Sequence, residues 1–507
     1  MDLSHLIGGF GDVLTLQNLL LVFAGCFLGT LIGVLPGVGP VAGTAILIPL
    51  TMGLDPAGAI IMLAAIFYGS QYGGTITSVL INTPGEAASA ITCIDGYEMT
   101  KQGRSGIALG IAAIGSFVGG MLATVGLVVA AAPLASLGLE VGPPEFFALM
   151  VLGMSLLVGL AGRSMVRALI SGAIGLLLAM VGIDPVEGRP RFAFGVVHFF
   201  DGIEFVAVLV GLFGLGEILA NLLESRSASP TTKVGRLLPT KRDLQDSRGP
   251  IARGSLVGFL LGLIPGMTGS VSSLLAYGTE RRFARNRDRL GKGAIEGVAS
   301  PESANNAHAN AALIPLFTLG IPGSPTVAVL MGAFLMNGLT PGPTMFQSDP
   351  DIAWAVIASL FVGNVVCLVL NLPLIRIWTM FLKIPTSLLT VIILVFLVVG
   401  SYSINNSTID VMVMFAFGIV GLFFRRLDIP LAPLVLTLIL GPFMEESLRQ
   451  SLELSLGEFS IFFTRPISLT LLVLAAVIFL VPLVRYLLRD KSQPTSAMSR
   501  MREDVEV

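Results

Sequence analysis

Charged residues are scarce in this chain. They make up 12% of its 507 residues, whereas soluble domains carry about 25%, so an ordinary soluble protein is excluded. Apolar residues make up 54%, and the mean hydropathy is +0.87. Several apolar runs approach the roughly 20 residues that a helix needs to cross a bilayer: Ile107–Ala132, Phe205–Leu223, Ile352–Pro373 and Ile467–Val484. We therefore predict an all-α polytopic membrane protein in a lipid bilayer.

Cysteine and histidine are also rare, and their positions show no metal-ligand spacing. They are Cys26, Cys93, Cys367, His5, His198 and His308. The sequence contains no G-x-x-x-x-G-K-[ST] phosphate loop and no Ser-His or Asp-Asp motif that would support an intramembrane enzyme. We expect no enzyme activity, no cofactor and no nucleic-acid partner. If the protein pumps a solute, another chain or an ion gradient must supply the energy.

The chain contains an internal repeat. A shift of 229 positions places "GVLPGVGPVAGT" (Gly33–Thr44) on "GLIPGMTGSVSS" (Gly262–Ser273), with the two Pro-Gly pairs aligned. A shift of 238 places "INTPGEAASA" on "LGIPGSPTVA", which aligns a second Pro-Gly pair. Interrupted helices in internal repeats are typical of secondary transporters. The alternative is that Pro-Gly pairs are frequent in any membrane protein and coincide here by chance.

Loop charges indicate that the two copies have opposite orientations, because Lys and Arg gather in cytoplasmic loops. Residues 1–13, before the first motif, contain no Lys or Arg, whereas 224–253, before the second, is basic, as is 281–292 after it. Beyond the second break the bias reverses: Lys101 and Arg104 follow the first copy, and Asp349 and Asp351 follow the second. We therefore predict inverted repeats.

The basic flanks of the second motif predict a re-entrant hairpin, since a single span would place them on opposite sides. Ser255–Ile264 would enter, Pro265–Gly269 would turn and Ser270–Gly278 would return. Ten helical residues reach about 15 Å, half of a hydrocarbon core roughly 30 Å thick, so the turn would lie near the midplane. The first copy would enter from the opposite face, although its leading helix, Leu14–Leu35, is long enough to span the bilayer fully.

The same rule predicts about eleven crossings and two re-entrant hairpins in two inverted repeats. The crossings lie near 57–100, 106–132, 145–162, 166–183, 203–223, 294–338, 352–373, 386–403, 411–424, 429–444 and 466–484. The domains are a first repeat (1–223), a basic cytoplasmic linker (224–253), a second repeat (254–488) and a polar cytoplasmic tail (489–507).

The Pro-Gly breaks offer binding groups for an anion. A broken helix exposes free N–H groups and the positive end of a helix dipole, which bind carboxylate or phosphate. Glycines allow close approach of the backbone, and hydroxyls add donors. The candidate substrate ligands are Gly37, Val38, Gly39, Thr44, Thr83, Gly85, Ser89, Gly266, Met267, Thr268, Ser270, Ser273, Gly323, Ser324 and Thr326. Alternatively, the hydroxyls only cap the next helix or bond to the i−4 carbonyl.

Polar side chains within the apolar runs form a second candidate set. The predicted ligands for a cation or for substrate are Tyr72, Thr75, Asn305, Asn306 and Asn310. The alternative for the asparagines is hydrogen bonding between helices. Glu86 and Glu302 are acids near the breaks, and an intramembrane acid is a functional candidate; either could instead cap a helix at the interface.

Several motifs resemble the large membrane subunit of the tripartite tricarboxylate transporters, the TctA type. They are "GVLPGVGP", "YGGTITSVLINTPGEAAS", "DGYEMTKQGRSG", "GKGAIEGVASPESANN" and "LGIPGSP", and the resemblance extends from about Leu16 to Arg485. It implies a multi-pass permease of the bacterial inner membrane. The implied partners are a small membrane subunit (TctB type) and a periplasmic solute-binding protein (TctC type) that delivers a carboxylate. The resemblance also implies symport driven by a cation gradient, typically Na⁺.

The substrate within the carboxylates stays open, because the two copies differ at the turn, with Thr268 opposite Gly39, and because His308 lies where we expect small residues. The favoured interpretation is cation-coupled uptake of a di- or tricarboxylate by alternating access. An anion-selective, channel-like protein is the alternative, since inverted breaks also occur in channels.

Overall fold

The computed structural model describes residues 3–487 except 36–37, 138–141, 161–163, 185–187, 224–233, 285–286, 343, 383 and 385. The elements up to residue 223 are α1 (Leu3–Val13), α2 (Leu16–Val34), α3 (Gly39–Leu47), η1 (Ile48–Thr51), α4 (Pro56–Ile81), η2 (Ala87–Ala90), α5 (Thr92–Lys101), α6 (Ser105–Leu137), α7 (Pro143–Leu160), α8 (Met165–Ala179), β1 (Gly182–Ile183), β2 (Pro190–Arg191), η4 (Val197–Asp201), α9 (Phe205–Leu209), the π-helix η5 (Val210–Leu215) and α10 (Gly216–Leu223).

The remaining elements are all helical. They are α11 (Lys241–Gly262), α12 (Gly269–Phe283), η6 (Arg287–Arg289), α13 (Glu296–Ala311), α14 (Leu313–Leu319), α15 (Pro325–Met336), α16 (Met345–Ser348), α17 (Pro350–Asn371), α18 (Ile375–Phe381), α19 (Thr386–Asn405), α20 (Thr408–Arg426), α21 (Leu431–Leu454), α22 (Ile461–Thr464) and α23 (Pro466–Leu487).

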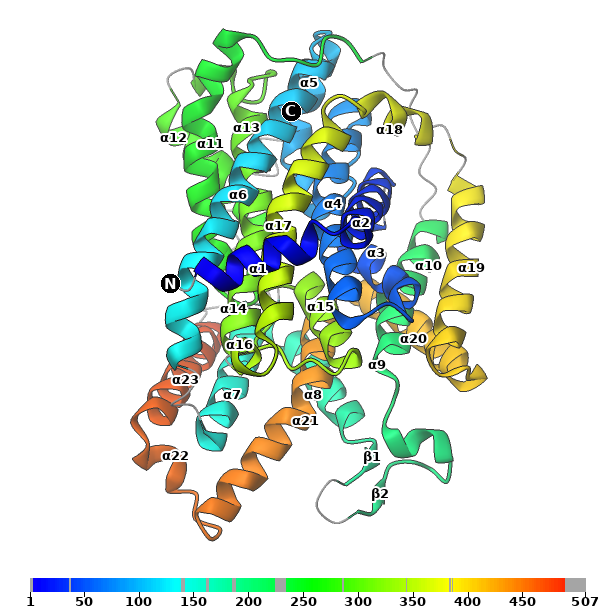
Figure 1. The fold of residues 1–507 in the computed structure, drawn as a ribbon, viewed down its shortest axis with the longest axis vertical. Helices are drawn as coiled ribbons and strands as arrows, with labels where there is room; N and C mark the ends of the chain where they lie inside the picture. Colours follow the sequence, from blue (N-terminus) through cyan, green and yellow to red (C-terminus); the bar gives the residue numbers. More distant parts are fainter. Residues whose placement is uncertain are drawn as a thin grey trace.

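Seven of the described helices are long and apolar enough to cross a membrane, and several shorter helices are apolar too. The hydrophobic stretch of α4 is completely buried inside the protein, and Figure 1 shows α4 among other helices. Outer helices such as α19 and α20 instead expose rows of large apolar side chains, including Val395, Val399, Phe415 and Ile419. Apolar rows facing outward suit a lipid surrounding, so the predicted helical membrane protein is confirmed.

The first motif forms a helical hairpin of α2 and α3. Helix α2 runs parallel to α4: a Cβ on Gly25 would meet the Met62 carbonyl, and one on Gly29 would meet the Ile66 carbonyl. The chain then turns back along α3, which also packs on α4. Both ends of the hairpin therefore lie toward the same end of α4, although the 19 residues of α2 are long and apolar enough to cross a membrane.

The second motif forms the matching hairpin of α11 and α12. Helix α11 runs parallel to α13, since a Cβ on Gly254 would meet the Ser300 carbonyl and one on Gly258 the Ala304 carbonyl. Arg253 on α11 pairs with Glu280 on α12 at 2.7 Å, so α12 returns alongside α11. Compared with the expected boundaries, α11 ends two residues earlier, at Gly262, and α12 begins at Gly269.

The two helix breaks that follow the hairpins are formed in the same way, by a left-handed residue and a Pro-Gly pair. Asn82 (φ 53°) ends α4 in the left-handed region, and Gly320 (φ 69°) does so for α14. Left-handed residues commonly terminate helices. A Pro-Gly pair follows each of them, and proline cannot continue the helix. The Ser324 side chain then accepts from the Val327 N–H at 3.3 Å and starts α15.

Different elements lie at the two ends of the molecule. At one end, α5, α11 and α12 come together (Figure 1), and this end holds the basic residues Lys101, Arg104, Arg281 and Arg282. The opposite end holds α22 and the short antiparallel β1–β2 pair, which no sequence pattern indicated. The sides of the membrane on which these loops lie and the number of crossings stay predictions.

The predicted linker 224–253 contains a helical part, because α11 already begins at Lys241. Thr240 and Asp243 form a reciprocal capping box at this end. Residues 224–233 and the predicted tail 489–507 lie outside the described residues.

Candidate functional site

Each hairpin tip abuts the helix break of its own half. A Cβ on Gly85 would lie 2.2 Å from the Gly33 carbonyl oxygen, so only glycine allows this approach. In the second half, the Gly266 N–H donates to the Gly323 carbonyl at 3.1 Å, and Gly266 has φ 86°. In each half, a glycine of the hairpin therefore contacts the glycine of the Pro-Gly break: Gly33 lies against Gly85, and Gly266 lies against Gly323.

The returning helix of each hairpin packs against the segment after the break of the other half. Helix α12 contacts η2, and α3 contacts α15. A Cβ on Gly269 would lie 3.3 Å from the Ala88 Cβ. The two halves therefore interlock at the breaks, although their motifs are more than 200 residues apart in sequence.

Two buried carboxylates lie at this junction. Glu302 is 1% exposed and accepts hydrogen bonds from Thr75 (2.5 Å) and from Thr92. Glu86 is 6% exposed and accepts from the Asn305 amide at 2.5 Å. The Gln71 amide also lies against Glu86, 2.5 and 2.7 Å from its two oxygens.

The partners of both carboxylates are neutral hydroxyls and amides. Within the part of the chain that the structure describes, no Lys or Arg forms a salt bridge with Glu86 or Glu302. Burying unpaired negative charge is costly. A junction of this composition favours a bound proton or cation. Both glutamates are buried within the protein, and Glu86 also occupies the N-cap of η2, where it forms a capping box with Ser89.

The three predicted asparagines of α13 have different partners. Asn305 lies at the carboxylates, as described above. Asn306 donates to Ser116 on α6 at 2.7 Å, and Asn310 donates to the Gly120 carbonyl (3.0 Å) and to Thr124 (3.2 Å) on the same helix. Asn306 and Asn310 therefore make the interhelical bonds of the alternative interpretation, while Asn305 faces the candidate site.

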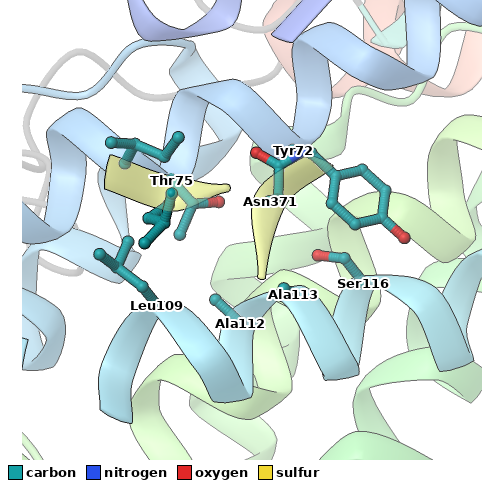
Figure 2. Close-up of a pocket in the computed structure, with 9 residues that line it drawn as sticks. Tyr72, Thr75, Leu109, Ala112, Ala113, Ser116 and Asn371 are labelled. Carbon is teal, nitrogen blue, oxygen red and sulfur yellow. The ribbon is translucent and has the colours of Figure 1, made fainter. Parts of the chain in front are cut away.

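Tyr72 and Thr75 line a small cavity beside the carboxylates (Figure 2). The Tyr72 hydroxyl donates to Asn364 at 3.2 Å. The cavity volume is about 10 Å³, which is near the lower limit for one water molecule. Its other lining residues are Ile76, Leu109, Ala112, Ala113, Ser116, Asn371 and Ile375.

The hydroxyls of the second hairpin have several local roles. Ser273 donates to the Pro301 carbonyl at 3.2 Å. Ser272 lies 2.9 Å from His308 Nδ1, so His308, which has no evident partner in the sequence, has one in the fold. Thr268 occupies the N-cap of α12 but its side chain makes no capping bond, and Ser270 follows it, half-buried, in the first turn.

The remaining predicted ligands lie at the same breaks. Val38 and Gly39 (φ 66°) begin α3, and Met267 lies in the second turn, its N–H donating to Ile264. The Thr44 hydroxyl is buried without a partner among the residues that the structure describes. Ser89 bonds Ser78 and caps η2 with Glu86, Thr83 bonds the Ile81 carbonyl, and Thr326 is buried in α15. Gly37 lies outside the described residues.

Sequence patterns alone missed several polar residues of this region. Ser116 and Asn371 lie in helices without a Pro-Gly break nearby, and Thr92 begins α5 just beyond the stretch "INTPGEAASA". Gln71 was noticed only as one of several polar residues in "YGSQYGGTITS". Tertiary packing of α5, α6 and α17 brings them to the carboxylates and the cavity, so no local signal could have identified them.

The fold defines a multi-pass helical membrane protein with a buried polar junction. The family model described as "Tripartite tricarboxylate transporter TctA family" matches residues 19–436 of this chain. The chain belongs to this family, which comprises transporters and not enzymes.

Two curated relatives come from Agrobacterium vitis. One, the "Uncharacterized 52.8 kDa protein in TAR-I ttuC' 3'region", is 45% identical over 490 residues, covering 96% of this chain and 98% of its own. The other, the "Uncharacterized protein in TAR-II ttuC' 3'region", is 44% identical over 220 residues, covering 43% of this chain and 91% of its own. No solved structure matches the chain significantly.

Proposed function

We propose that this chain is the permease subunit of a tripartite, cation-coupled carrier that takes up di- or tricarboxylates by alternating access. The observation that carries the proposal is the junction of two hairpin tips and two helix breaks around the buried carboxylates Glu86 and Glu302. Irregular backbone at membrane depth is tolerated only where it is buried in protein or lines a cavity. Paired breaks of this kind form substrate sites in secondary transporters.

The substrate carboxylate would bind at the N-terminal ends of α3 and α12. Both helices begin at a hairpin tip, where their first N–H groups and dipoles favour negative charge. The Thr268 hydroxyl is not used for capping, and Ser270 lies in the first turn, so both hydroxyls suit a ligand. The coupling cation, Na⁺ in our proposal, would offset the substrate charge and the charge of the nearby glutamates.

Alternating access would follow because each half contributes one hairpin and one helix break to the junction. The predicted inverted repeats give each hairpin an equivalent on the opposite side of the membrane. The hairpins and broken helices would move as the substrate-carrying part, and outer helices such as α19, α20 and α23 would form the scaffold. The protein would act in the bacterial inner membrane with a small membrane subunit and a periplasmic binding protein, as expected for the family.

Uptake of labelled carboxylates into proteoliposomes tests this function. The chain is reconstituted with its small membrane subunit, and the binding protein is added outside, with or without an inward Na⁺ gradient. We expect saturable uptake that requires the binding protein and the gradient. An uptake rate that does not change with any cation gradient would disprove the proposed coupling. Ionic current without saturation and without the binding protein would instead indicate the channel alternative.

The double variant Thr268→Val with Ser270→Ala tests the substrate site. We expect the half-saturating carboxylate concentration to rise about tenfold or more, because two hydroxyl donors to a charged ligand are lost. Thr279→Val is the matched control, since the Thr279 hydroxyl is exposed on the same helix and bonds only the Leu275 carbonyl. Unchanged uptake kinetics in the double variant would assign these two residues to local structure.

A further inference from the structure

The cavity beside Tyr72 has a mixed lining, in which apolar residues of α4 and α6 and Ile375 alternate with a few polar side chains. Three oxygen-bearing side chains from three different helices surround it: Thr75 from α4, Ser116 from α6 and Asn371 from α17 (Figure 2). The Tyr72 hydroxyl bonds Asn364. With a volume of about 10 Å³, the cavity has room for one water-sized occupant.

Asn371 has an unused acceptor at this cavity. Its amide nitrogen donates to the Cys367 carbonyl (2.9 Å) and to Thr30 (3.4 Å). Its Oδ1 has no hydrogen-bond partner among the described residues, although Asn371 is only 3% exposed. A buried polar atom without a partner is costly, so this oxygen indicates a ligand that supplies positive charge or a donor.

Thr75 connects the cavity to the carboxyl group of Glu302. Its hydroxyl donates to Glu302 at 2.5 Å, and an oxygen whose proton is donated to a carboxylate becomes a stronger acceptor. Ser116 accepts from Asn306 at 2.7 Å. The cavity is thus lined by neutral oxygens, one of which is hydrogen-bonded to the carboxylate of Glu302. Such a set suits a hard monovalent cation, because hard cations prefer oxygen ligands.

We propose that this cavity is a site for one dehydrated monovalent cation of sodium size, with Asn371 Oδ1, Thr75 Oγ1 and Ser116 Oγ as ligands and Glu302 as the counter-charge. This inference rests on the proposed function, since it gives the coupling cation a location. The ligands also reach both halves: Asn371 bonds Thr30 of the first hairpin, and Thr75 and Ser116 bond Glu302 and Asn306 of α13. Binding of the cation would therefore stabilise one arrangement of the halves.

Sodium-dependent thermal stability of the purified chain in detergent tests the site without requiring transport. NaCl is titrated against choline chloride at constant ionic strength, with LiCl and KCl as further probes. We expect a saturable rise in Tm with Na⁺. Asn371→Ala and Thr75→Val should each weaken the apparent Na⁺ affinity about tenfold or more. Thr318→Val is the control, because Thr318 is equally buried and bonds only the Ile314 carbonyl.

Three results would overturn the site. One is a wild-type Tm that does not depend on Na⁺, as expected for a cavity that holds only water. Another is a stability that follows pH and not Na⁺, which would indicate a proton. The third is an unchanged Na⁺ affinity in both variants. If one variant fails to fold, Ser116→Ala takes its place, since it removes a ligand with a smaller change in volume.

The outcomes separate this inference from the proposed function. Carboxylate uptake driven by a proton gradient, together with Na⁺-independent stability, would disprove the cation site and leave the permease intact. Saturable Na⁺ binding without any carboxylate uptake would support the site and disprove the permease.

Discussion

At the scale of single residues, Asp95 shows how a buried charge is stabilised by backbone. Its carboxylate is fully buried on α5 and accepts from the N–H groups of Gly291, Gly293 and Ala294 and from the Tyr277 hydroxyl. Hydrogen bonds to a charged acceptor are stronger than neutral ones. This residue therefore fixes the loop that leads from the second hairpin to α13.

We expect Asp95→Asn to lower the free energy of unfolding by about 2 kcal/mol. Asparagine lacks the negative charge of the carboxylate. Its amide N–H groups would also face backbone N–H groups, and two donors cannot form a hydrogen bond with each other. Thermal unfolding in detergent, followed by circular dichroism, measures the change. Glu98→Gln is the control, because Glu98 lies on the same helix and pairs only with exposed Lys101. Equal stability of the two variants would contradict the role assigned to Asp95.

At the scale of elements, small residues allow the hairpins to pack. The glycines Gly254, Gly258 and Gly262 recur every four residues on α11 and face α13, and Gly25, Gly29 and Gly33 do the same on α2 toward α4. Small residues at this spacing let helix backbones approach closely in membranes. The hairpins are therefore held against the helices that lead to the breaks.

Gly258→Ala should reduce the yield of folded protein and its Tm. A Cβ there would lie 2.1 Å from the Ala304 carbonyl oxygen, which is backbone and cannot move without separating α11 from α13. Gly278→Ala on α12 is the control, because a Cβ there meets nothing within 4 Å. Size-exclusion chromatography and thermal unfolding measure both variants. A Gly258 variant as stable as the Gly278 variant would disprove the close packing.

The start of α11 depends on Asp243, which caps the helix with Thr240 and pairs with Arg104 at 3.0 Å. Burial alone would raise the pKa of Asp243, but the Thr240 hydrogen bonds and Arg104 outweigh it and lower that pKa below its usual value. A lowered pKa stabilises the fold above the ordinary Asp range, and this contribution disappears as the pH falls through the folded value.

We expect Asp243→Asn to lower the free energy of unfolding by about 1 kcal/mol at neutral pH. The difference from wild type should shrink below about pH 4, where the wild-type carboxylate also becomes protonated. Unfolding measured between neutral and acidic pH checks this. A difference that is constant over that pH range would show that the charge of Asp243 does not contribute.

At the scale of the whole molecule, apolar length made most helices predictable. The stretches predicted near 106–132, 352–373 and 466–484 correspond to α6, α17 and α23. The beginning of α11 was not predictable in this way, because Lys241–Arg253 is polar and its helix depends on the capping box and on Arg104.

The candidate site was predictable only in part, for a related reason. Pro-Gly breaks act locally, so they revealed Gly85, Gly323 and the neighbouring acids Glu86 and Glu302. Asn371 and Ser116 reach the cavity through packing of helices that are distant in sequence. Such contacts leave no periodic signal in one sequence.

The orientation of the halves is the remaining prediction for the whole molecule. If α11–α12 is re-entrant, Arg248 in the first half of α11 and Arg282 near the end of α12 face the cytoplasm together. Leu456, beyond α21 and 95% exposed, then faces the opposite side. Single cysteines at these positions, in a chain with Cys26, Cys93 and Cys367 replaced, are labelled in intact cells and inverted vesicles with an impermeant maleimide. We expect labels at 248 and 282 only in inverted vesicles and at 456 only in cells. Labels at 248 and 282 on opposite sides would make this hairpin a full crossing, and the inverted arrangement of the two halves would fail with it.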